Sequence, residues 1–203
     1  MTKDKTRCRK DRKPKENKDA GTNKDEKSLV CFQDVMTSDH DHADEEDSEF
    51  AAHALFELAN APIVGYRIDS NIMLRIHQDQ QDACGQHTGG IVWETSFLLL
   101  NYLRQRYSKG KYACGKTVLE VGAGCGLLGL GIYHSKLAKR VVLTETDLVM
   151  PNLQRNVAIN TSSLTTTTTN AHNDRLRVCS LDWTRCQQDC DKAKIKAHSM
   201  DMI

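Results

Sequence analysis

The chain has 203 residues, a length that fits one domain or slightly more. It carries 28 Lys and Arg against 27 Asp and Glu, so its formal net charge of +1 gives no general electrostatic reason to bind nucleic acid or an anionic membrane. No run approaches the roughly 18 apolar residues of a membrane-spanning helix, and the amino terminus is charged from Lys3 onward, so we expect neither a membrane span nor a secretory signal.

The charges are concentrated in two blocks. The first 27 residues hold eleven Lys and Arg against six Asp and Glu, whereas residues 39–49 hold seven acidic side chains and no Lys or Arg. Such blocks cannot bury enough apolar surface to offset the entropy of ordering, so residues 1–48 are predicted to form a disordered charged arm. Two alternatives stay open there: a nuclear-import or nucleic-acid patch at 7–15, and a weak metal site at His40 and His42.

The cysteine pattern gives no strong metal or disulfide signal. Eight cysteines occur in the chain, and without an export signal they are predicted to be thiols rather than disulfides. Cys186 and Cys190, followed by His198, have the spacing of a zinc half-site, but they lack the paired two-residue-spaced knuckle of a convincing site. The sequence therefore predicts no bound metal.

The folded domain is predicted to span residues 49–203, because hydrophobic periodicity begins at Phe50. Helices are indicated by apolar residues at helical spacing, and strands by short apolar runs between turn signals. In chain order the first half is predicted to contain a helix over 50–60, a hairpin of strands over 63–69 and 72–77, and a helix over 97–107 capped by Thr95 or Ser96.

The second half alternates strand and helix. The predicted elements are strands over 117–121, 140–144 and 176–181, with helices over 127–138 and 148–160 between them and a threonine-rich loop over 161–173. This alternation is typical of an α/β domain with a parallel sheet covered by helices on both faces. Residues 200–203 look like the opening of a fourth strand, so we expect the core to be incomplete at the end of this sequence.

The segment Val118–Gly129 is the most informative motif, because a buried strand runs into glycines and then directly into a helix. Glycines there let the backbone turn sharply and let a ligand approach closely. One register, Gly124-x-Gly126-x-x-Gly129, matches the dinucleotide-binding expression, but it begins too far beyond the strand. The favoured register is Glu120-x-Gly122-x-Gly124-x-Gly126, which places an acid at the end of the strand.

Acidic residues at two strand ends suit a cationic nucleoside. S-adenosylmethionine carries an ammonium group, a sulfonium and a ribose with two hydroxyls. Glu120 is placed to meet the ammonium, and an acid at the end of the second strand can accept from the ribose hydroxyls. Glu145 is the candidate for that second role, with Asp147 as its near competitor.

Four motifs in order resemble the seven-strand methyltransferases of family 16, which include small protein-lysine methyltransferases. They are Gly89–Glu94, Val118–Leu127, Thr144-Glu145 with Asn156 and Asn160 beyond, and Leu181–Trp183. The resemblance covers about residues 63–203 and implies a Rossmann-like fold, of which this chain holds the N-terminal half of the sheet. It also implies S-adenosyl-L-methionine as cofactor, and methylation of a lysine in a chaperone, ATPase or translation factor. The enzyme is expected to be a monomer of the cytoplasm, with the nucleus as a second location.

The resemblance also assigns roles to individual residues. Trp93 would line the cofactor pocket, and Asp182 and Trp183 would border the adenine, although core packing is the alternative for either Trp. Glu145 would bind the ribose where the family usually has Asp. The loop under the cofactor would be formed by Gly122, Ala123, Gly124 and Gly126.

Methyl transfer requires an uncharged nucleophile held in line with the methyl–sulfur bond, so a lysine acceptor must first lose a proton. In the family an Asp-x-x-Tyr element beyond the fourth strand lines the acceptor pocket, and that element would follow Ile203. We therefore expect the 203-residue chain alone to be poorly soluble and without turnover. Two alternatives stay open: a non-catalytic fragment or pseudo-enzyme, and a nicotinamide-dinucleotide oxidoreductase that uses the offset glycine register.

Overall fold

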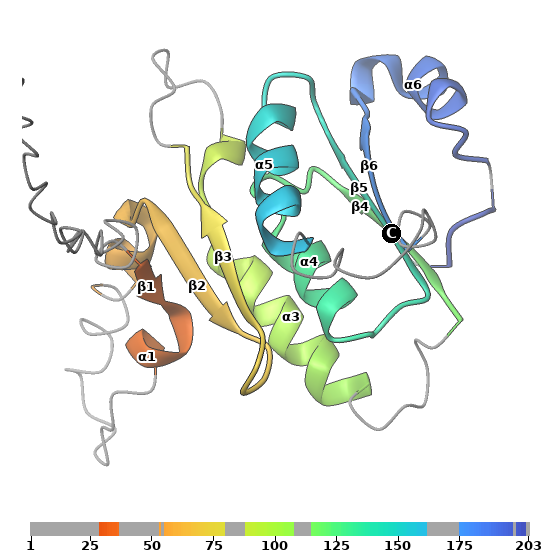
Figure 1. Ribbon diagram of the computed structural model, residues 1–203. Helices are drawn as coiled ribbons and strands as arrows, with labels where there is room; N and C mark the ends of the chain where they lie inside the picture. Colours follow the sequence, from red (N-terminus) through yellow and green to blue (C-terminus); the bar gives the residue numbers. More distant parts are fainter. Residues whose placement is uncertain are drawn as a thin grey trace, which may run out of the picture.

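The computed structural model of the chain describes residues 29–36, 53, 55–79, 88–107, 115–161, 175–196 and 198–201. These residues form two three-stranded sheets with helices between them (Figure 1). The first sheet has the order β1-β2-β3, with strands Leu29–Cys31, Ile63–Arg67 and Met73–His77. The second has the order β4-β5-β6, with strands Thr117–Val121, Arg140–Glu145 and Leu176–Ser180. The helices are α1 (Phe32–Met36), α3 (Glu94–Tyr107), α4 (Leu127–His134), α5 (Met150–Thr161) and α6 (Cys186–Lys192), and residues 55–60, within the helix predicted over 50–60, are helical as well.

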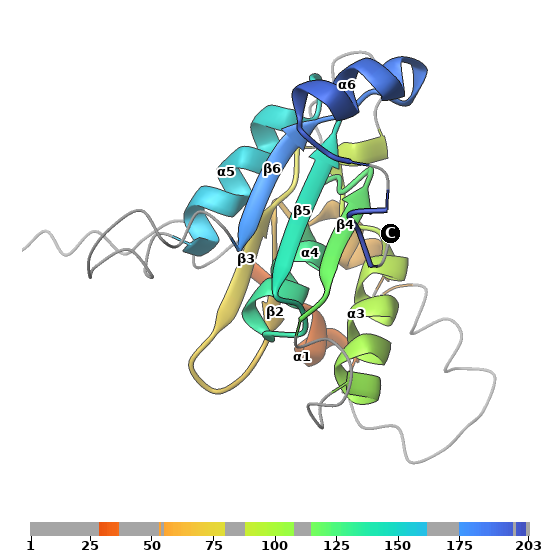
Figure 2. The same cartoon turned by 90° about the vertical axis from the view of Figure 1, so that its right-hand side faces the viewer.

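The parallel sheet predicted for the second half is confirmed. Strands β4, β5 and β6 pair in parallel and lie side by side in Figure 2. Helix α4 contacts both β5 and β3, and α5 contacts β3, so the apolar core lies between the two sheets. On the other face, α6 and the residues after it border a groove with Leu119, Val121 and Leu181.

The predicted hairpin is also confirmed, with a longer turn than expected. Strands β2 and β3 are antiparallel, and the chain reverses over residues 68–72. The Asp69 carboxylate closes this turn, because its Oδ1 accepts from the N–H groups of Asn71 and Ile72 at 2.8 and 3.0 Å. An aspartate that bonds the backbone two residues on is a common way to stabilise such a turn.

Residues 29–36 correct part of the predicted disordered arm. Strand β1 pairs in parallel with β2, and α1 follows it at once. The Phe32 ring of α1 is buried and stacks on Phe97 of α3, with ring centroids 3.9 Å apart. This short apolar stretch lies between the two charged blocks and finds its partners far along the chain, which a local count of charges cannot detect. The rest of the arm, with its basic segment and His40 and His42, lies outside the described residues.

Two buried asparagines attach α5 to the edge of β3. The Asn156 side chain accepts from the His77 N–H and donates to the His77 carbonyl, both at 2.9 Å. The Asn160 side chain makes the same pair of bonds to Arg75, again at 2.9 Å. Each side-chain amide thus bonds the N–H and the carbonyl of one strand residue, as the backbone of a neighbouring strand would. Helix α5 therefore satisfies the hydrogen bonds of this sheet edge in place of a fourth strand.

Several helix ends differ from the predictions. Helix α3 begins at Glu94, before the expected caps, and α5 begins at Met150 after a turn. Helix α4 ends at His134 instead of continuing to residue 138, because Lys136 adopts a left-handed φ of 55°. The Leu137 N–H then bonds the Ile132 carbonyl at 3.0 Å, which is the Schellman pattern. Glycine is the usual signal for this pattern, and its absence explains the wrong boundary.

Residues 198–201 do not form a strand, although this segment returns to the parallel sheet. The Asp201 N–H donates to the Thr117 carbonyl at 2.9 Å, beside the first residue of β4. The remainder of the expected fourth strand, residues 202–203, lies outside the described residues, as does the threonine run. Among the described helices, none combines the length and apolar character needed to cross a bilayer.

Candidate functional site

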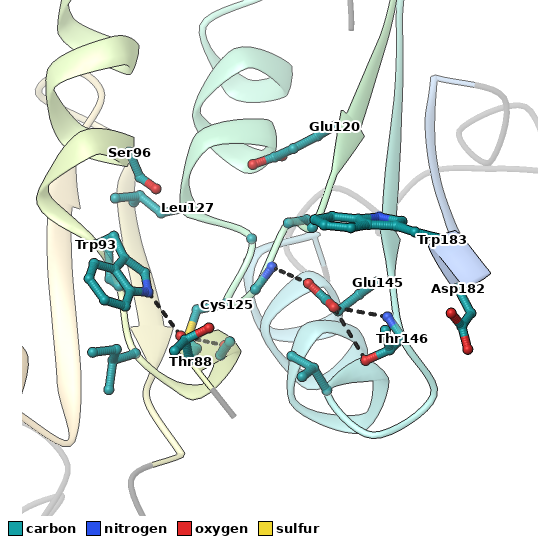
Figure 3. A pocket seen from close by; sticks show the side chains of 18 of the residues that line it. Thr88, Trp93, Ser96, Glu120, Cys125, Leu127, Glu145, Thr146, Asp182 and Trp183 are labelled. Carbon is teal, nitrogen blue, oxygen red and sulfur yellow. Dashed lines mark hydrogen bonds between the residues drawn. The ribbon is translucent and has the colours of Figure 1, made fainter. Parts of the chain in front are cut away.

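A cavity of about 420 Å³ opens at the carboxyl ends of β4 and β5 (Figure 3). This is the edge at which open α/β sheets bind their ligands. Its lining comes from four segments of the chain, around residues 88–96, 120–127, 145–149 and 182–184. The nine residues predicted to bind a cofactor are brought together here: Trp93, Glu120, Gly122, Ala123, Gly124, Gly126, Glu145, Asp182 and Trp183.

The glycine loop after β4 needs glycine for its backbone. Gly122, Gly124 and Gly126 have φ values of 70°, 54° and 86°, the left-handed region that side chains disfavour. Space is also limited, since a Cβ on Gly126 would lie 2.6 Å from the Leu153 side chain and one on Gly124 would lie 3.2 Å from the Gly89 carbonyl oxygen. The loop therefore exposes bare backbone to the cavity.

Glu145 fixes this loop from the end of β5. Its Oε2 accepts from the Gly124 N–H at 2.9 Å, and its Oε1 accepts from the Thr146 N–H at 2.9 Å and the Thr146 hydroxyl at 3.4 Å. The residue is only 9% exposed, yet it lines the cavity. The competitor Asp147 points elsewhere, with a side chain 73% exposed that accepts from the Ser180 hydroxyl. Of these two candidates, Glu145 is therefore the one that lines the cavity.

Glu120 is the second acid that lines the cavity. Its Oε2 is enclosed and has no hydrogen-bond partner among the described residues, and its carboxylate points toward α4 (Figure 3). Burial raises the pKa of Glu120 to about 8; the Gly129 N–H acts in the opposite direction, and the Glu145 charge raises the pKa further. Burial thus favours the neutral, protonated form of this carboxyl group.

Two tryptophans lie on opposite sides of the cavity. Trp93 is 46% exposed, and its Nε1 donates to the Thr88 carbonyl at 2.9 Å. Trp183 is 67% exposed and lies flat beside Glu145 (Figure 3). Core packing, the alternative weighed for both residues, is wrong, because neither indole is buried. Both are placed to cover a flat ligand.

Asp182 lines the cavity but uses much of its carboxylate locally. Its Oδ1 accepts from the Thr184 N–H at 2.9 Å and the Thr184 hydroxyl at 2.7 Å, which caps the short 3-10 helix Trp183–Arg185. Its Oδ2 lies 3.4 Å from Arg185 Nε. These contacts hold the pKa of Asp182 below its usual value, with the Thr184 bonds as the main cause. The expected contact with an adenine amine stays a prediction.

Other lining residues were missed by the sequence analysis. They come from the short 3-10 helix Thr88–Gly90, from the glycine loop and from the turn after β5, and they include Thr88, Gly89, Cys125, Thr146 and Val149. The Gly89-Gly90 pair was the only local signal for the first group. Burial raises the pKa of the Cys125 thiol to about 12, which favours its protonated, unreactive form.

The described cysteines are free thiols. Cys186 and Cys190 lie one turn apart on α6 with their sulfurs 3.9 Å apart. In the part of the chain that the structure describes, no three His, Cys, Asp or Glu side chains gather in a way that could hold a metal ion. His198 therefore does not complete the half-site considered above.

The sequence was compared with known protein families and with known proteins. The family described as lysine methyltransferase matches residues 68–203. The chain is similar to EEF1A lysine methyltransferase 3 of Xenopus tropicalis, with 34% identity over 92 residues, which are 45% of this chain and 35% of that protein. It is also similar to protein-lysine methyltransferase METTL21E of Mus musculus, with 37% identity over 73 residues, covering 36% of this chain and 29% of that protein.

A third relative is protein N-lysine methyltransferase METTL21A of Xenopus tropicalis, with 37% identity over 70 residues, or 34% of this chain and 30% of that protein. The chain thus spans about a third of the length of the curated relatives it matches. Among solved structures, P. horikoshii TYW2 in complex with MeSAdo shares 16% identity over 68% of this chain and 50% of its own, with a TM-score of 0.34. That structural similarity is too low to support an inference.

Proposed function

Because the chain belongs to the lysine methyltransferase family, we propose that its cavity binds S-adenosylmethionine for the methylation of a lysine side chain in a protein. The observation that carries the proposal is the buried Glu145 carboxylate, which binds the glycine loop and lines the cavity. It is supported by the family match, because relatives of this chain are named as protein-lysine methyltransferases.

The residues of the cavity fit the cofactor. A carboxylate can accept about four hydrogen bonds, and Glu145 receives three from the protein, which leaves room for a ribose hydroxyl. Glu120 also lines the cavity, and the positive charge of a ligand there would offset part of the cost of burying its carboxylate. The bare backbone of Gly122 and Gly124 allows close approach of a ligand.

The bound cofactor would supply a methyl group on a positively charged sulfur, which is strongly electrophilic. The protein then has to bind the cofactor, orient it toward the acceptor and exclude water from the site. Glu145 and the Gly124 N–H fix the floor of the cavity, and Trp93 and Trp183 form its two sides. An acceptor group is expected outside the described residues, because the Asp-x-x-Tyr element of the family is not found among them.

The acceptor that we propose is a lysine of a translation factor, chaperone or ATPase. A translation-factor substrate is supported by one relative, which is named as a methyltransferase of EEF1A. We also propose a cytoplasmic location, where such acceptors occur.

Calorimetric titration with S-adenosylhomocysteine tests the cofactor part of the proposal. We expect the 203-residue chain to bind it at one site, and Glu145→Ala to weaken binding about tenfold or more, because hydrogen bonds to a charged group contribute about 1.5 to 3 kcal/mol. Asp147→Asn is the matched control and should change the affinity less than about twofold, since Asp147 does not line the cavity. Unchanged affinity in Glu145→Ala, or tighter binding of a nicotinamide dinucleotide, would contradict the proposal.

The acceptor is tested separately with labelled S-adenosylmethionine. A longer form of the protein that contains this chain and an acceptor element is incubated with candidate translation factors and chaperones. Label on a lysine, located by mass spectrometry and lost in Glu145→Ala, supports the proposal. Transfer only to nucleic acid or to small molecules would contradict it.

A further inference from the structure

Residues 182–184, which follow β6, form one wall of the cavity and begin where the backbone hydrogen bonds between β5 and β6 end. The last amide of this segment to bond β5 is that of Leu181, whose N–H donates to the Glu145 carbonyl at 2.9 Å. The next amide, that of Asp182, donates instead to Oδ2 of Asp189 at 2.9 Å. A side chain of α6 therefore holds the first residue of the wall in place of a strand.

Asp189 is buried to an unusual degree for an acid. It is 4% exposed, and with Glu145 it is one of the two acidic residues in the buried set of the described chain. Arg185 and Lys192 lie beside it, at 3.9 and 3.6 Å from its two oxygens. The bond from the Asp182 N–H holds the pKa of Asp189 below its usual value, and the two cations act in the same direction, so the group is ionised at neutral pH.

The two buried acids have matching roles in the geometry. Glu145 accepts from an N–H of the glycine loop on one side of the cavity, and Asp189 accepts from an N–H of the turn on the other side. Glu145 lines the cavity itself, whereas Asp189 does not line it and lies behind the turn, beside Arg185 and Lys192. Asp189 can therefore influence a ligand through the backbone that it holds, and also through Arg185, which lies 3.4 Å from the Asp182 carboxylate.

We propose that Asp189 is a positioning residue for the cofactor, which acts by fixing the Asp182–Thr184 turn and with it the Trp183 side chain. This inference rests on the proposed function for the identity of the ligand. Trp183 is 67% exposed, so its place over the cavity depends mainly on the backbone of the turn. Asp182 caps the turn from inside, and Asp189 anchors the same residue from α6.

Two variants separate the hydrogen bond from the charge. In Asp189→Ala the Asp182 N–H loses its acceptor, so we expect S-adenosylhomocysteine to bind about tenfold more weakly, the effect of losing a bond to a charged group. In Asp189→Asn the side-chain oxygen can still accept, so the affinity should stay within about threefold of that of the parent chain. Asp191→Ala is the matched control, because Asp191 is exposed on the same helix and its side chain accepts from Gln187, one turn earlier on that helix.

Hydrogen exchange in the ligand-free protein provides a second measurement that does not depend on the cofactor. The Asp182 amide should exchange at least about tenfold faster in Asp189→Ala, and at close to the parental rate in Asp189→Asn and Asp191→Ala. If the parent chain binds no S-adenosylhomocysteine, the proposed function fails and the exchange rates alone decide whether Asp189 anchors the turn.

Faster exchange together with weaker binding in Asp189→Ala, both restored in Asp189→Asn, would support the proposal. Equal affinity and equal exchange in Asp189→Ala and the parent would overturn it. An equal loss of affinity in both variants would also overturn it, because charge rather than the hydrogen bond would then be responsible. If Asp189→Ala does not fold, Asp189→Asn decides: a loss of affinity beyond about tenfold would count against the proposal.

Discussion

The two sheets of this molecule are held in place by different kinds of side chain. At the N-terminal sheet the buried polar groups are amides, namely Gln78, Asn156 and Asn160, which bond backbone groups at the edge and end of β3 and in the adjoining loops. At the parallel sheet the fully buried Thr144 hydroxyl donates to the Glu120 carbonyl at 2.7 Å, and the other buried side chains that bond backbone are the carboxylates Glu145 and Asp189, one on each side of the cavity.

This difference indicates which part of the molecule is suited to bind a charged ligand. An amide satisfies both an N–H and a carbonyl and is neutral, so it can join two elements without an ion nearby. A buried carboxylate costs more and is retained where its charge is balanced or used. The acids lie around the cavity, and the amides lie where the two sheets are joined.

The glycine loop is the most sensitive part of the parallel side. In Gly126→Ala a residue with φ of 86° gains a Cβ that lies 2.6 Å from the fully buried Leu153, so we expect the free energy of unfolding to fall by about 3 to 4 kcal/mol. Gly124→Ala has a φ of 54° and a nearest contact of 3.2 Å, and should cost only about 1 kcal/mol. Urea unfolding of both variants measures the difference, and equal losses would contradict the steric explanation.

The amide side of the comparison is tested by Asn156→Ala. Asn156 is fully buried, and besides His77 its Nδ2 donates to the Cys125 carbonyl at 3.0 Å, so its removal takes hydrogen bonds from backbone groups in both regions. We expect the free energy of unfolding to fall by about 2 to 3 kcal/mol. Arg155→Ala, on the exposed side of the same helix, should change stability by less than about 0.5 kcal/mol. Similar values for the two variants would show that the link between α5 and β3 is unimportant.

A pH profile distinguishes the carboxylates from the amides. Burial raises the pKa of Glu120 from 4.5 to about 8, opposed by the Gly129 N–H and assisted by the Glu145 charge, so between these pH values the folded state binds more protons than the unfolded state. The free energy of unfolding should therefore fall as pH rises through this window, by about 1 kcal/mol per pH unit. Glu120→Gln should flatten the profile, whereas Asn156→Ala should lower it without changing its slope. A profile for Glu120→Gln that keeps the parental slope would contradict this assignment.

The smallest expected effect is at the end of α4. Lys136 occupies the left-handed position of the Schellman pattern, where glycine is preferred, so Lys136→Gly should raise the free energy of unfolding by about 1 kcal/mol. Thermal unfolding measures the change. A decrease in stability would show that the Lys136 side chain contributes more than its backbone conformation costs.

The sequence predicted the parallel side of the molecule well, because its signals are local. Strand β4 was predicted with its observed bounds, and β5 and β6 to within one residue at their carboxyl ends. The positive φ values of Gly122, Gly124 and Gly126 explain why the glycine spacing carried so much information. All nine predicted binding residues line one cavity, although their contacts with a ligand remain predictions.

The amide side could not be predicted in the same way, because its contacts join residues far apart in the chain. Asn156 and His77 are 79 positions apart, and Asn160 and Arg75 are 85 apart. An asparagine in a helix gives no local indication that it satisfies a strand edge. Asp189 was missed for a related reason, since a charged residue in a polar helix is usually exposed. Likewise, the folding of β1 and α1 could not be predicted locally, because Phe32 of α1 packs on Phe97, which is distant in the chain.

The central claim is that the bend between β4 and α4 holds S-adenosylmethionine through Glu145. A crystal structure of the chain grown with S-adenosylhomocysteine tests it most directly. We predict ligand density in the cavity between Trp93 and Trp183, with the ribose in contact with the Glu145 carboxylate. An empty cavity in crystals grown at a saturating concentration of S-adenosylhomocysteine, or ligand bound elsewhere on the protein, would contradict the proposal that Glu145 binds the cofactor.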